Sequence, residues 1–281
     1  MRFWPALAVA GVDAEFLLGE LDAFSPTAAD ELDDTVRVFF SSSDARDNAL
    51  AFLESRKIPA TAADVPDEDW ARRSQENITP VVVGTICVTP PWHAHAPLAS
   101  ASPLRIVIEP SMGFGTGHHA TTRLCLKALQ EVDLAGKDVL DVGTGSGVLA
   151  IAAAALGARA AVGIDNDPDA IRNASENVAL NPAVRNVRVE VADVESGLGA
   201  ATADVVTANL TGALLERAAH DLLTALRPGG TIIVSGLMSS ERGAVERAFS
   251  DAHVIEALVE EEWVALLLRQ RATNVSALHS V

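Results

Sequence analysis

The chain has 281 residues, of which 49% are hydrophobic, and a formal net charge of -17 at pH 7. This length allows one large α/β domain and a smaller one, while the acidic balance argues against direct binding to nucleic acid and favours a basic partner. No apolar run approaches the ~20 residues of a membrane span, and the two cysteines lack the spacing of metal ligands. We therefore expect a cytoplasmic globular protein with no bound metal ion and no membrane contact.

Residues 1–62 alternate strand-like and helix-like segments. Residues 3–9 and 35–40 have strand patterns, residues 13–21 have helical spacing, and Ser43 is a candidate N-cap of a further helix. The segment contains no catalytic constellation. We predict a small α/β domain, ferredoxin-like, whose role is substrate recognition.

Residues 63–100 are predicted to link this domain to a larger one. A short helix over residues 65–76 would carry acids in its first turn, where the helix dipole favours them, and an apolar strand is expected over residues 80–88. The larger domain is predicted to span residues 101–271, followed by a tail over residues 272–281.

The larger domain has the pattern of a doubly wound, Rossmann-like α/β fold. Strands are expected, with helices between the first five, at positions centred near residues 140, 162, 189, 206, 234, 256 and 266. Residues 227–230 should form a turn before the fifth strand. Glu261 and Glu262 leave almost no connection between the last two strands, so these must form an antiparallel hairpin. A seven-stranded sheet with an antiparallel last strand is the methyltransferase version of this fold, whereas nucleotide dehydrogenases usually end with a sixth parallel strand.

The most informative motif joins the first of these strands to a helix of small residues. The strand ends at Asp141, and the turn that follows contains Gly143, Gly145 and Gly147. Glycine lets the backbone turn tightly and lets a ligand lie on the main chain, and the helix offers unpaired N–H groups. Asp165, twenty-two residues after Gly143, closes the next strand, where a carboxylate can accept hydrogen bonds from ribose hydroxyls.

The spacing of the glycines indicates which cofactor is bound. A dinucleotide fingerprint would place its third glycine at position 148, which is occupied by Val148. The sequence instead reads Asp-x-Gly-x-Gly-x-Gly, which resembles motif I of the S-adenosylmethionine-dependent methyltransferases, where no pyrophosphate has to be bound. We therefore predict S-adenosylmethionine as the cofactor.

A second glycine-rich segment precedes this motif. Phe114, Thr116 and Gly117 belong to a loop that leads into a helix, and Thr122 lies near the start of that helix. A loop of this kind can fold over a cofactor and exclude water.

Several short segments, in the order in which they occur, resemble one known family. They are residues 65–70, 114–117 with Thr121 and Thr122, 141–147, 163–168, 208–210 and 261–263. Together they are similar to the bacterial methyltransferases that modify ribosomal protein L11 of the large subunit, over residues 63–270. The resemblance implies an enzyme that methylates lysine ε-amines and an N-terminal α-amine of this ribosomal protein, and a small N-terminal domain that holds it.

The resemblance also implies which residues line the cofactor site, namely Thr122, Gly143, Asp165 and Asn209. Asn209 is the predicted catalytic residue, because its amide oxygen at the end of the fourth strand could accept an N–H of the amine; its alternative role is that of a turn residue. Asp193 either faces the adenine amino group or is a solvated loop acid. With the loop and motif residues, the predicted cofactor contacts are Phe114, Thr116, Gly117, Thr122, Asp141, Gly143, Gly145, Gly147, Asp165, Asp193 and Asn209.

The chain differs from the family pattern at residues 118–120, at residues 209–212 and over the first 60 residues. His118 or His119 either relays a proton, because histidine titrates near neutrality, or makes local hydrogen bonds. Two other functions stay open: a methyltransferase of the same fold acting on another protein lysine or a small amine, and a non-catalytic cofactor-binding interaction module. The oligomeric state is left open, with a monomer favoured.

Overall fold

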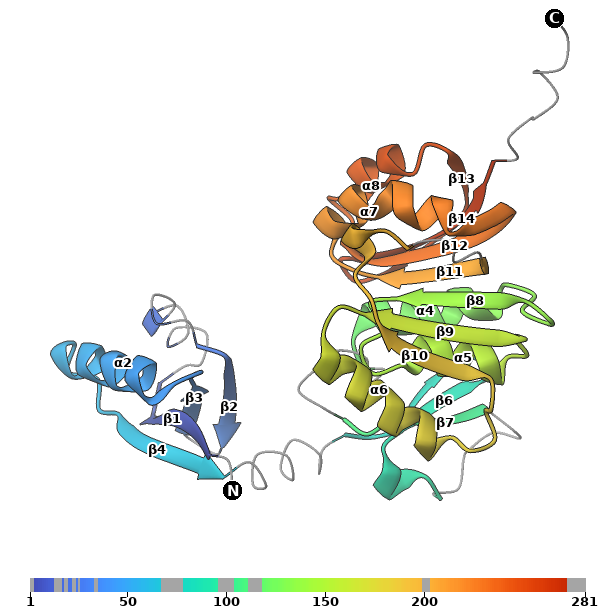
Figure 1. Ribbon diagram of the computed structural model, residues 1–281. Coiled ribbons are helices and arrows are strands. Elements are labelled where there is room, and N and C mark those ends of the chain that lie inside the picture. The colour runs from blue at the N-terminus through green and yellow to red at the C-terminus, as the bar shows by residue number, and fades with distance from the viewer. Residues whose placement is uncertain are drawn as a thin grey trace, which may run out of the picture. The chain divides into compact units, whose positions relative to one another are not determined.

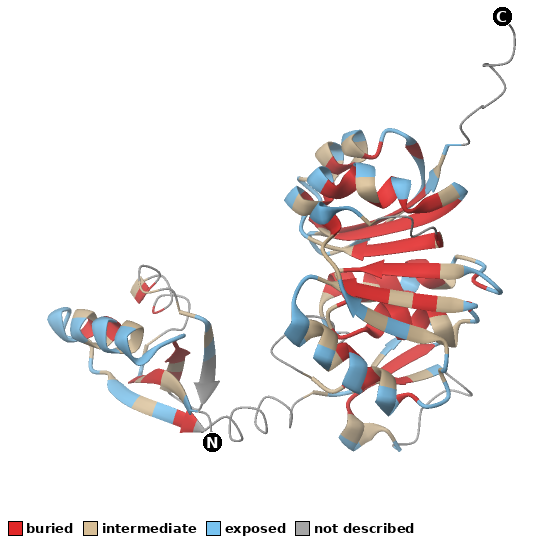
Figure 2. Cartoon of the chain, viewed as in Figure 1, coloured by how far each residue is buried: buried red, intermediate tan, exposed pale blue. Residues whose placement is uncertain are grey.

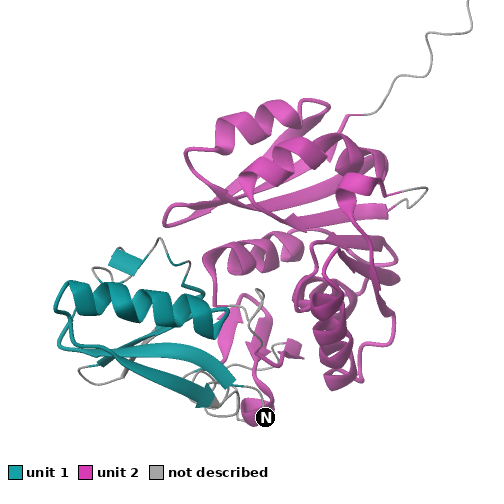
Figure 3. Cartoon of the chain, turned by 60° about the vertical axis from the view of Figure 1, so that its left-hand side comes forward, with its two compact units in different colours: residues 1–78 teal, residues 79–281 magenta. Residues whose placement is uncertain are grey.

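The computed structural model describes residues 3–12, 17, 20–21, 24, 26–32, 35–66, 78–95, 104–110, 118–198 and 203–271. The chain divides into two compact units, residues 1–78 and residues 79–281, which are coloured separately in Figure 3. Each unit has its own buried core, and each is described by itself below.

Unit 1 is a four-stranded antiparallel sheet with helix α2 (Ser43–Ser55). Its strands are β1 (Phe3–Ala10), β2 (Ala28–Leu32), β3 (Thr35–Phe39) and β4 (Thr61–Pro66). The strand order β2-β3-β1-β4, with α2 joining β3 to β4, is the ferredoxin-like arrangement that the sequence predicted. Of the predicted first helix, the structure describes residues 17, 20 and 21, which are helical.

The core of unit 1 forms where one face of the sheet packs against α2. Leu7 and Val9 of β1 and Val38 of β3 lie in one buried cluster with Ala49 and Leu53 of α2. Alternate strand residues therefore point to the helix, as the period of two along a strand requires.

Three details of the sequence interpretation of this region are wrong. The N-cap of α2 is Ser42, whose hydroxyl accepts from the Ala45 N–H at 3.2 Å, and not Ser43. β2 was not predicted. Residues 65 and 66 close β4 instead of opening a helix, and the rest of the predicted helix, residues 67–76, lies outside the described residues.

Unit 2 begins with a small sheet of β5 (Val81–Val83), β6 (Ile86–Thr89) and β7 (Leu104–Val107). The single strand predicted over residues 80–88 is a hairpin, which turns at Gly84 with φ +57°. The Gln130 side chain accepts from the Thr85 N–H at 2.7 Å and fills the space that a Cβ on Gly84 would need. A distant glutamine thus fixes this turn.

The main sheet of unit 2 has seven strands in the order β10-β9-β8-β11-β12-β14-β13 (Figure 1). They are β8 (Asp138–Val142), β9 (Ala160–Asp165), β10 (Val187–Val191), β11 (Ala203–Asn209), β12 (Leu226–Met238), β13 (Ala252–Glu260) and β14 (Trp263–Gln270). The first five in spatial order are parallel, and β14 is antiparallel to both of its neighbours. The predicted seven-stranded sheet and its closing hairpin are confirmed.

Both faces of this sheet carry buried side chains, so the central strands are almost wholly buried (Figure 2). One core cluster joins the sheet to α4 (Ala120–Gln130) and α5 (Val148–Ala155), and α6 (Pro168–Leu180) packs at its edge through Val178. The other joins the sheet to α7 (Gly212–Thr224) and α8 (Arg242–Ala248). The sheet is therefore a rigid platform whose carboxyl edge is free to carry a site.

Two local predictions for the sheet differ from the structure. Between β10 and β11 the described residues contain only the short 3₁₀ turn η3 (Val194–Ser196), not the predicted helix. Residues 227–230 are part of β12, where the pairing register with β11 shifts and Gly229 has φ +74°.

Candidate active site

The glycine turn after β8 has a backbone that only glycine adopts without strain. Gly143, Gly145 and Gly147 have φ values of +69°, +52° and +81°, in the left-handed region that side chains disfavour. The N–H groups of Gly143 and Thr144 both donate to the Ile164 carbonyl at 2.9 Å. The turn is thereby fastened to the end of β9, next to the predicted ribose acid.

Asp165 closes β9 and is half-buried. Its Oδ2 accepts from the Gly145 N–H at 2.9 Å, and its Oδ1 accepts from the Asp167 N–H at 3.1 Å. A carboxylate has about four acceptor sites, so each oxygen keeps capacity for a further donor. The arrangement aims a fixed carboxylate at the space above the glycine turn, where two ribose hydroxyls could donate to it.

A cavity of about 330 Å³ opens at this carboxyl edge of the sheet. Its size is in the range of small-ligand sites. Several residues predicted from sequence meet in its lining: Gly143, Gly145, Asp165, Asp193 and Asn209. Leu210 and Leu214 add apolar surface. The structure thus brings the ribose acid, the glycine turn and the predicted catalytic amide to one space.

Asp141 does not line this cavity. It is buried, and its carboxylate accepts from the hydroxyls of Thr144 and Thr207, both at 2.6 Å. Burial raises the pKa of Asp141 above its ordinary value, against the lowering effect of the two threonine hydrogen bonds. In the structure this acid ties the glycine turn to β11.

Thr122 is on the first turn of α4, and its side chain is 1% exposed. Within the described residues its Oγ1 has no hydrogen-bond partner. A buried hydroxyl without a partner is costly, and a polar cofactor group would satisfy it. The unpaired hydroxyl of Thr122, the carboxylate of Asp165 and the glycines of the turn fit the polar and ribose groups of S-adenosylmethionine.

Three predicted contacts, Phe114, Thr116 and Gly117, lie outside the described residues. The described residues on either side of this segment are held by side chains that sequence reasoning missed. Asn177 on α6 accepts from the Glu109 N–H at 2.8 Å and donates to the Ser146 carbonyl at 2.9 Å. Asn177 therefore joins the glycine turn to the strand that precedes the loop.

On the other side of that segment, Arg123 on α4 donates to the His118 carbonyl and forms an ion pair with Glu260. The His119 ring nitrogen Nδ1 caps α4 and lies 2.8 Å from the Thr121 hydroxyl, and the ring packs edge-on against Trp263 at 4.8 Å between centroids. In this structure His119 makes local contacts at the start of α4.

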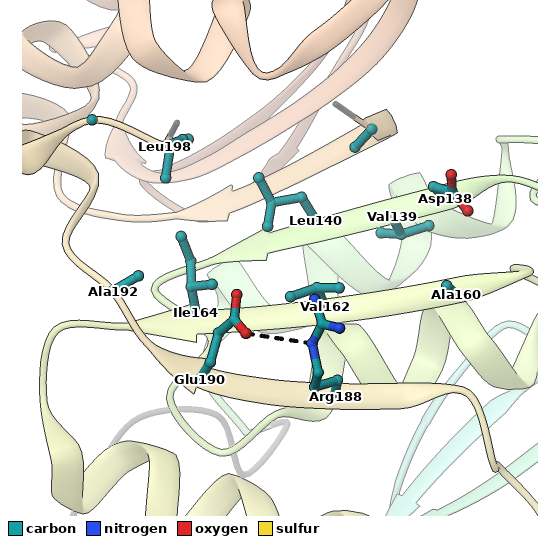
Figure 4. A pocket seen from close by; sticks show the side chains of 12 residues that line it. Asp138, Val139, Leu140, Ala160, Val162, Ile164, Arg188, Glu190, Ala192 and Leu198 are labelled. Atoms are coloured by element: carbon teal, nitrogen blue, oxygen red, sulfur yellow. Dashed lines mark ion pairs between the residues drawn. The ribbon is translucent and has the colours of Figure 1, made fainter. Parts of the chain in front are cut away.

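A separate cavity of about 380 Å³ lies against β8, β9 and β10 (Figure 4). Leu140, Val162 and Ile164 give it an apolar lining, and Arg188 and Glu190, both on β10, form an ion pair at 3.4 Å in its wall. None of the predicted site residues lines it. It is not the site that the motifs define.

The seven-stranded sheet with its reversed last strand, the glycine turn and the acid after β9 define the class of the protein. It is an S-adenosylmethionine-dependent methyltransferase with a Rossmann-like fold. The family model described as "Ribosomal protein L11 methyltransferase (PrmA)" matches residues 4–271. The chain therefore belongs to the ribosomal protein L11 methyltransferase family.

Individual relatives agree with this assignment. The chain is 38% identical over 265 residues to the ribosomal protein L11 methyltransferase of Geobacter metallireducens, a match that covers 88% of this chain and 86% of the relative. It is 40% identical over 217 residues to that of Deinococcus radiodurans, covering 72% and 79%. A crystal structure of a ribosomal protein L11 methylase from Lactobacillus delbrueckii subsp. bulgaricus shares the fold, with a TM-score of 0.63, 24% identity and coverage of 69% of this chain and 98% of that one.

The family match corrects one expectation from sequence. The resemblance was limited to residues 63–270, but the family model extends through unit 1 to residue 4. Family membership also sets aside the non-catalytic interaction module, because the chain is a methyltransferase. No helix in the described part of the chain has the length and apolar character to cross a membrane.

Proposed function

We propose that this enzyme transfers methyl groups from S-adenosylmethionine to lysine ε-amines and to the N-terminal α-amine of ribosomal protein L11. The observation that carries the proposal is that Asn209 lines the same cavity as Asp165 and the glycine turn. An amide that can align an amine thus lies beside the groups suited to the cofactor. Membership in the ribosomal protein L11 methyltransferase family supports the choice of substrate.

The chemistry asks little of the protein beyond alignment and removal of water. The bound cofactor supplies a methyl group already activated on a sulfonium. A free lysine, with a pKa of about 10.4, is almost wholly protonated at pH 7, and burial beside a positive charge lowers that pKa. Asn209 accepts one N–H of the neutral amine with its amide oxygen and leaves the nitrogen lone pair directed at the methyl carbon. Such alignment contributes a large part of the acceleration in displacement reactions.

In this proposal the remaining predicted residues hold the cofactor. Asp165 accepts from the ribose hydroxyls, Gly143 and Gly145 let the cofactor lie on the backbone, and Thr122 donates from its buried hydroxyl. Asp193 contacts the adenine amino group. Phe114, Thr116 and Gly117 stay predicted cofactor contacts outside the described residues, Gly147 is the N-cap of α5, and Asp141 fixes the turn through its threonine partners.

Unit 1 is proposed to bind the protein substrate. The enzyme is proposed to act as a monomer in the cytoplasm. The chain has a net charge of -17, which favours encounter with a basic target. The recognition domain includes residues up to Pro66, because β4 pairs with β1 along its whole length.

The test separates alignment of the amine from binding of the cofactor. Asn209→Ala should lower the rate of methylation much more than it lowers S-adenosylmethionine affinity, because the lost contact matters most in the transition state. Asn209→Asp keeps an oxygen acceptor of the same size and should retain part of the rate. Single-turnover methylation of purified ribosomal protein L11 and calorimetry give the two quantities. Equal losses of rate and affinity in Asn209→Ala would make Asn209 a cofactor contact only.

A further inference from the structure

Leu210, the residue after Asn209, lies between two glycines of different elements. An ideal Cβ placed on Gly143 would lie 2.4 Å from the Leu210 Cδ2 atom, and one placed on Gly236 would lie 2.2 Å from the Leu210 carbonyl oxygen. The Leu210 N–H donates to the Ser235 carbonyl at 2.9 Å. The side chain of Leu210 therefore fills the space beside the cofactor turn, while its main chain lies on β12.

The contact on β12 coincides with a β-bulge. Val234 pairs with Leu266 and Leu237 pairs with Val264, so three steps along β12 oppose two steps along β14. Gly236 lies within this bulge at φ +87°. Bulges of this kind, with a left-handed glycine, redirect a strand next to functional sites.

We propose that Gly236 and Leu210 are positioning residues for Asn209. Gly236 leaves the space in which the main chain of Leu210 lies, and the Leu210 side chain packs in the space left by Gly143. The bulge in β12 thus sets the position of the Asn209 amide relative to the cofactor turn. This inference rests on the proposed role of Asn209 in aligning the amine.

A shift of the Asn209 amide by about 1 Å would affect the reaction more than it would affect cofactor binding. The Leu210 carbonyl cannot stay in place if residue 236 carries a Cβ, because 2.2 Å is far inside van der Waals contact and the atom belongs to the backbone. A misplacement of about 1 Å can cost roughly a hundredfold in rate. The groups proposed to bind ribose, on β9 and in the glycine turn, do not contact residue 236 in this way.

The chain offers a matched control in the same strand. Gly229 is also in β12, has φ +74° and is also at a register shift, but a Cβ there would meet nothing within 4 Å. Gly229→Ala and Gly236→Ala therefore impose a similar backbone strain, and only the second collides with Leu210. We expect Gly236→Ala to lower kcat on ribosomal protein L11 by about tenfold to a hundredfold, with a smaller loss of cofactor affinity because Leu210 also lines the cofactor cavity, and Gly229→Ala to keep the wild-type kcat.

A double-mutant cycle tests the other side of Leu210. Gly143→Ala should weaken S-adenosylmethionine binding, and adding Leu210→Ala should recover part of this loss, because it removes the Cδ2 atom that the new Cβ would meet. Leu210→Ala should not rescue Gly236→Ala, whose collision is with backbone atoms. Calorimetry with S-adenosylmethionine measures the cycle and also reports whether each variant is folded.

Equal kcat values for Gly236→Ala and the wild type, or equal losses in Gly236→Ala and Gly229→Ala, would overturn the inference. If Gly236→Ala does not fold, the double-mutant cycle still tests the inference. Additive effects of Gly143→Ala and Leu210→Ala on S-adenosylmethionine affinity would contradict the packing of Leu210 on the cofactor turn. If the wild-type enzyme does not methylate ribosomal protein L11, the proposed function fails, while the affinity cycle still tests the placement of Leu210.

Discussion

At the scale of single residues, Asp165 illustrates how the backbone prepares a binding group. Two backbone N–H groups, from Gly145 and Asp167, hold its carboxylate in place. In the proposed role, little conformational freedom would be lost when ribose hydroxyls donate to it.

Asp165→Ala should weaken S-adenosylmethionine binding by about 1.5–3 kcal/mol, the range for hydrogen bonds to a charged group. Asp169→Ala is the matched control, because it removes the same charge from an exposed position that does not line the cavity. Calorimetry on both variants checks the prediction. Unchanged affinity in Asp165→Ala, or an equal loss in Asp169→Ala, would remove Asp165 from the site.

Sequence reasoning identified the glycine turn and Asp165 because their spacing along the chain is the signal. It did not find Asn177 or Gln130, whose partners are backbone atoms far away in sequence. Gly236 was missed for the same reason, since its proposed role depends on the approach of Leu210, which follows β11. Side-chain patterns do not encode contacts with a distant main chain.

Among the helices and strands, those with a clear apolar pattern were predicted, including the edge strands β10 and β13 of the main sheet, whereas β2 and β4 of unit 1 were not. β2 and β4 are the two edges of the sheet in unit 1, and their sequences are largely small or polar. An edge strand needs less apolar surface, so its pattern is weaker. Of the helix expected between β10 and β11, the described residues 192–198 contain only the 3₁₀ turn η3.

A charge network joins the amino ends of β8, β11 and β12. Arg227 donates to Asp138 at 2.7 Å and to Asp204 at 2.6 Å, and Arg159 also pairs with Asp138. Hydrogen bonds from Arg159 and Arg227 lower the pKa of Asp138 to about 2. For Asp204, burial raises the pKa, but the Asp138 N–H and Arg227 together outweigh it and lower the pKa.

These lowered pKa values predict a specific loss of stability in acid. A carboxylate whose pKa is lower in the folded state stabilises the fold fully above its ordinary pKa near 4, and this contribution is lost as the pH falls toward about 2. The contribution of Asp138 to the free energy of unfolding is at most about 2 kcal/mol, since one pKa unit is about 1.4 kcal/mol and solvent screens its ion pairs.

Arg227→Gln should therefore lower the free energy of unfolding at pH 7 and flatten its decline between about pH 4 and pH 2. Arg172→Gln, which breaks the exposed pair with Asp169, is the control and should change neither. Urea unfolding at several pH values measures both effects. If the free energy of unfolding of Arg227→Gln falls as steeply with decreasing pH as that of the wild type, the network does not cause the acid sensitivity.

In the whole molecule, the predicted site residues all belong to one of the two compact units. Unit 1 has its own core around Leu7 and Leu53, and none of the predicted site residues belongs to it. The sequence predicted its ferredoxin-like class, but not its similarity to the family, because residues 1–62 contain few short motifs. The full family match depends on similarity spread over residues 4–271.

Deletion of residues 1–66 should leave S-adenosylmethionine binding nearly intact and abolish methylation of folded ribosomal protein L11. The cut follows Pro66 because β4 completes the sheet of unit 1. Calorimetry and a methylation assay, each run beside the full chain, give the comparison. A truncated enzyme that methylates the intact ribosomal protein at the full rate would show that unit 1 has no recognition role.

Mass spectrometry of ribosomal protein L11 shows whether this enzyme methylates its amines. Purified, unmethylated ribosomal protein L11 is incubated with the full chain and S-adenosylmethionine, digested, and compared with a reaction that contains Asn209→Ala. We expect added methyl groups on lysine side chains and on the N-terminal amine in the wild-type reaction, and few or none with the variant. An unmodified ribosomal protein L11, under conditions in which calorimetry shows the enzyme bound to its cofactor, would overturn the proposed function.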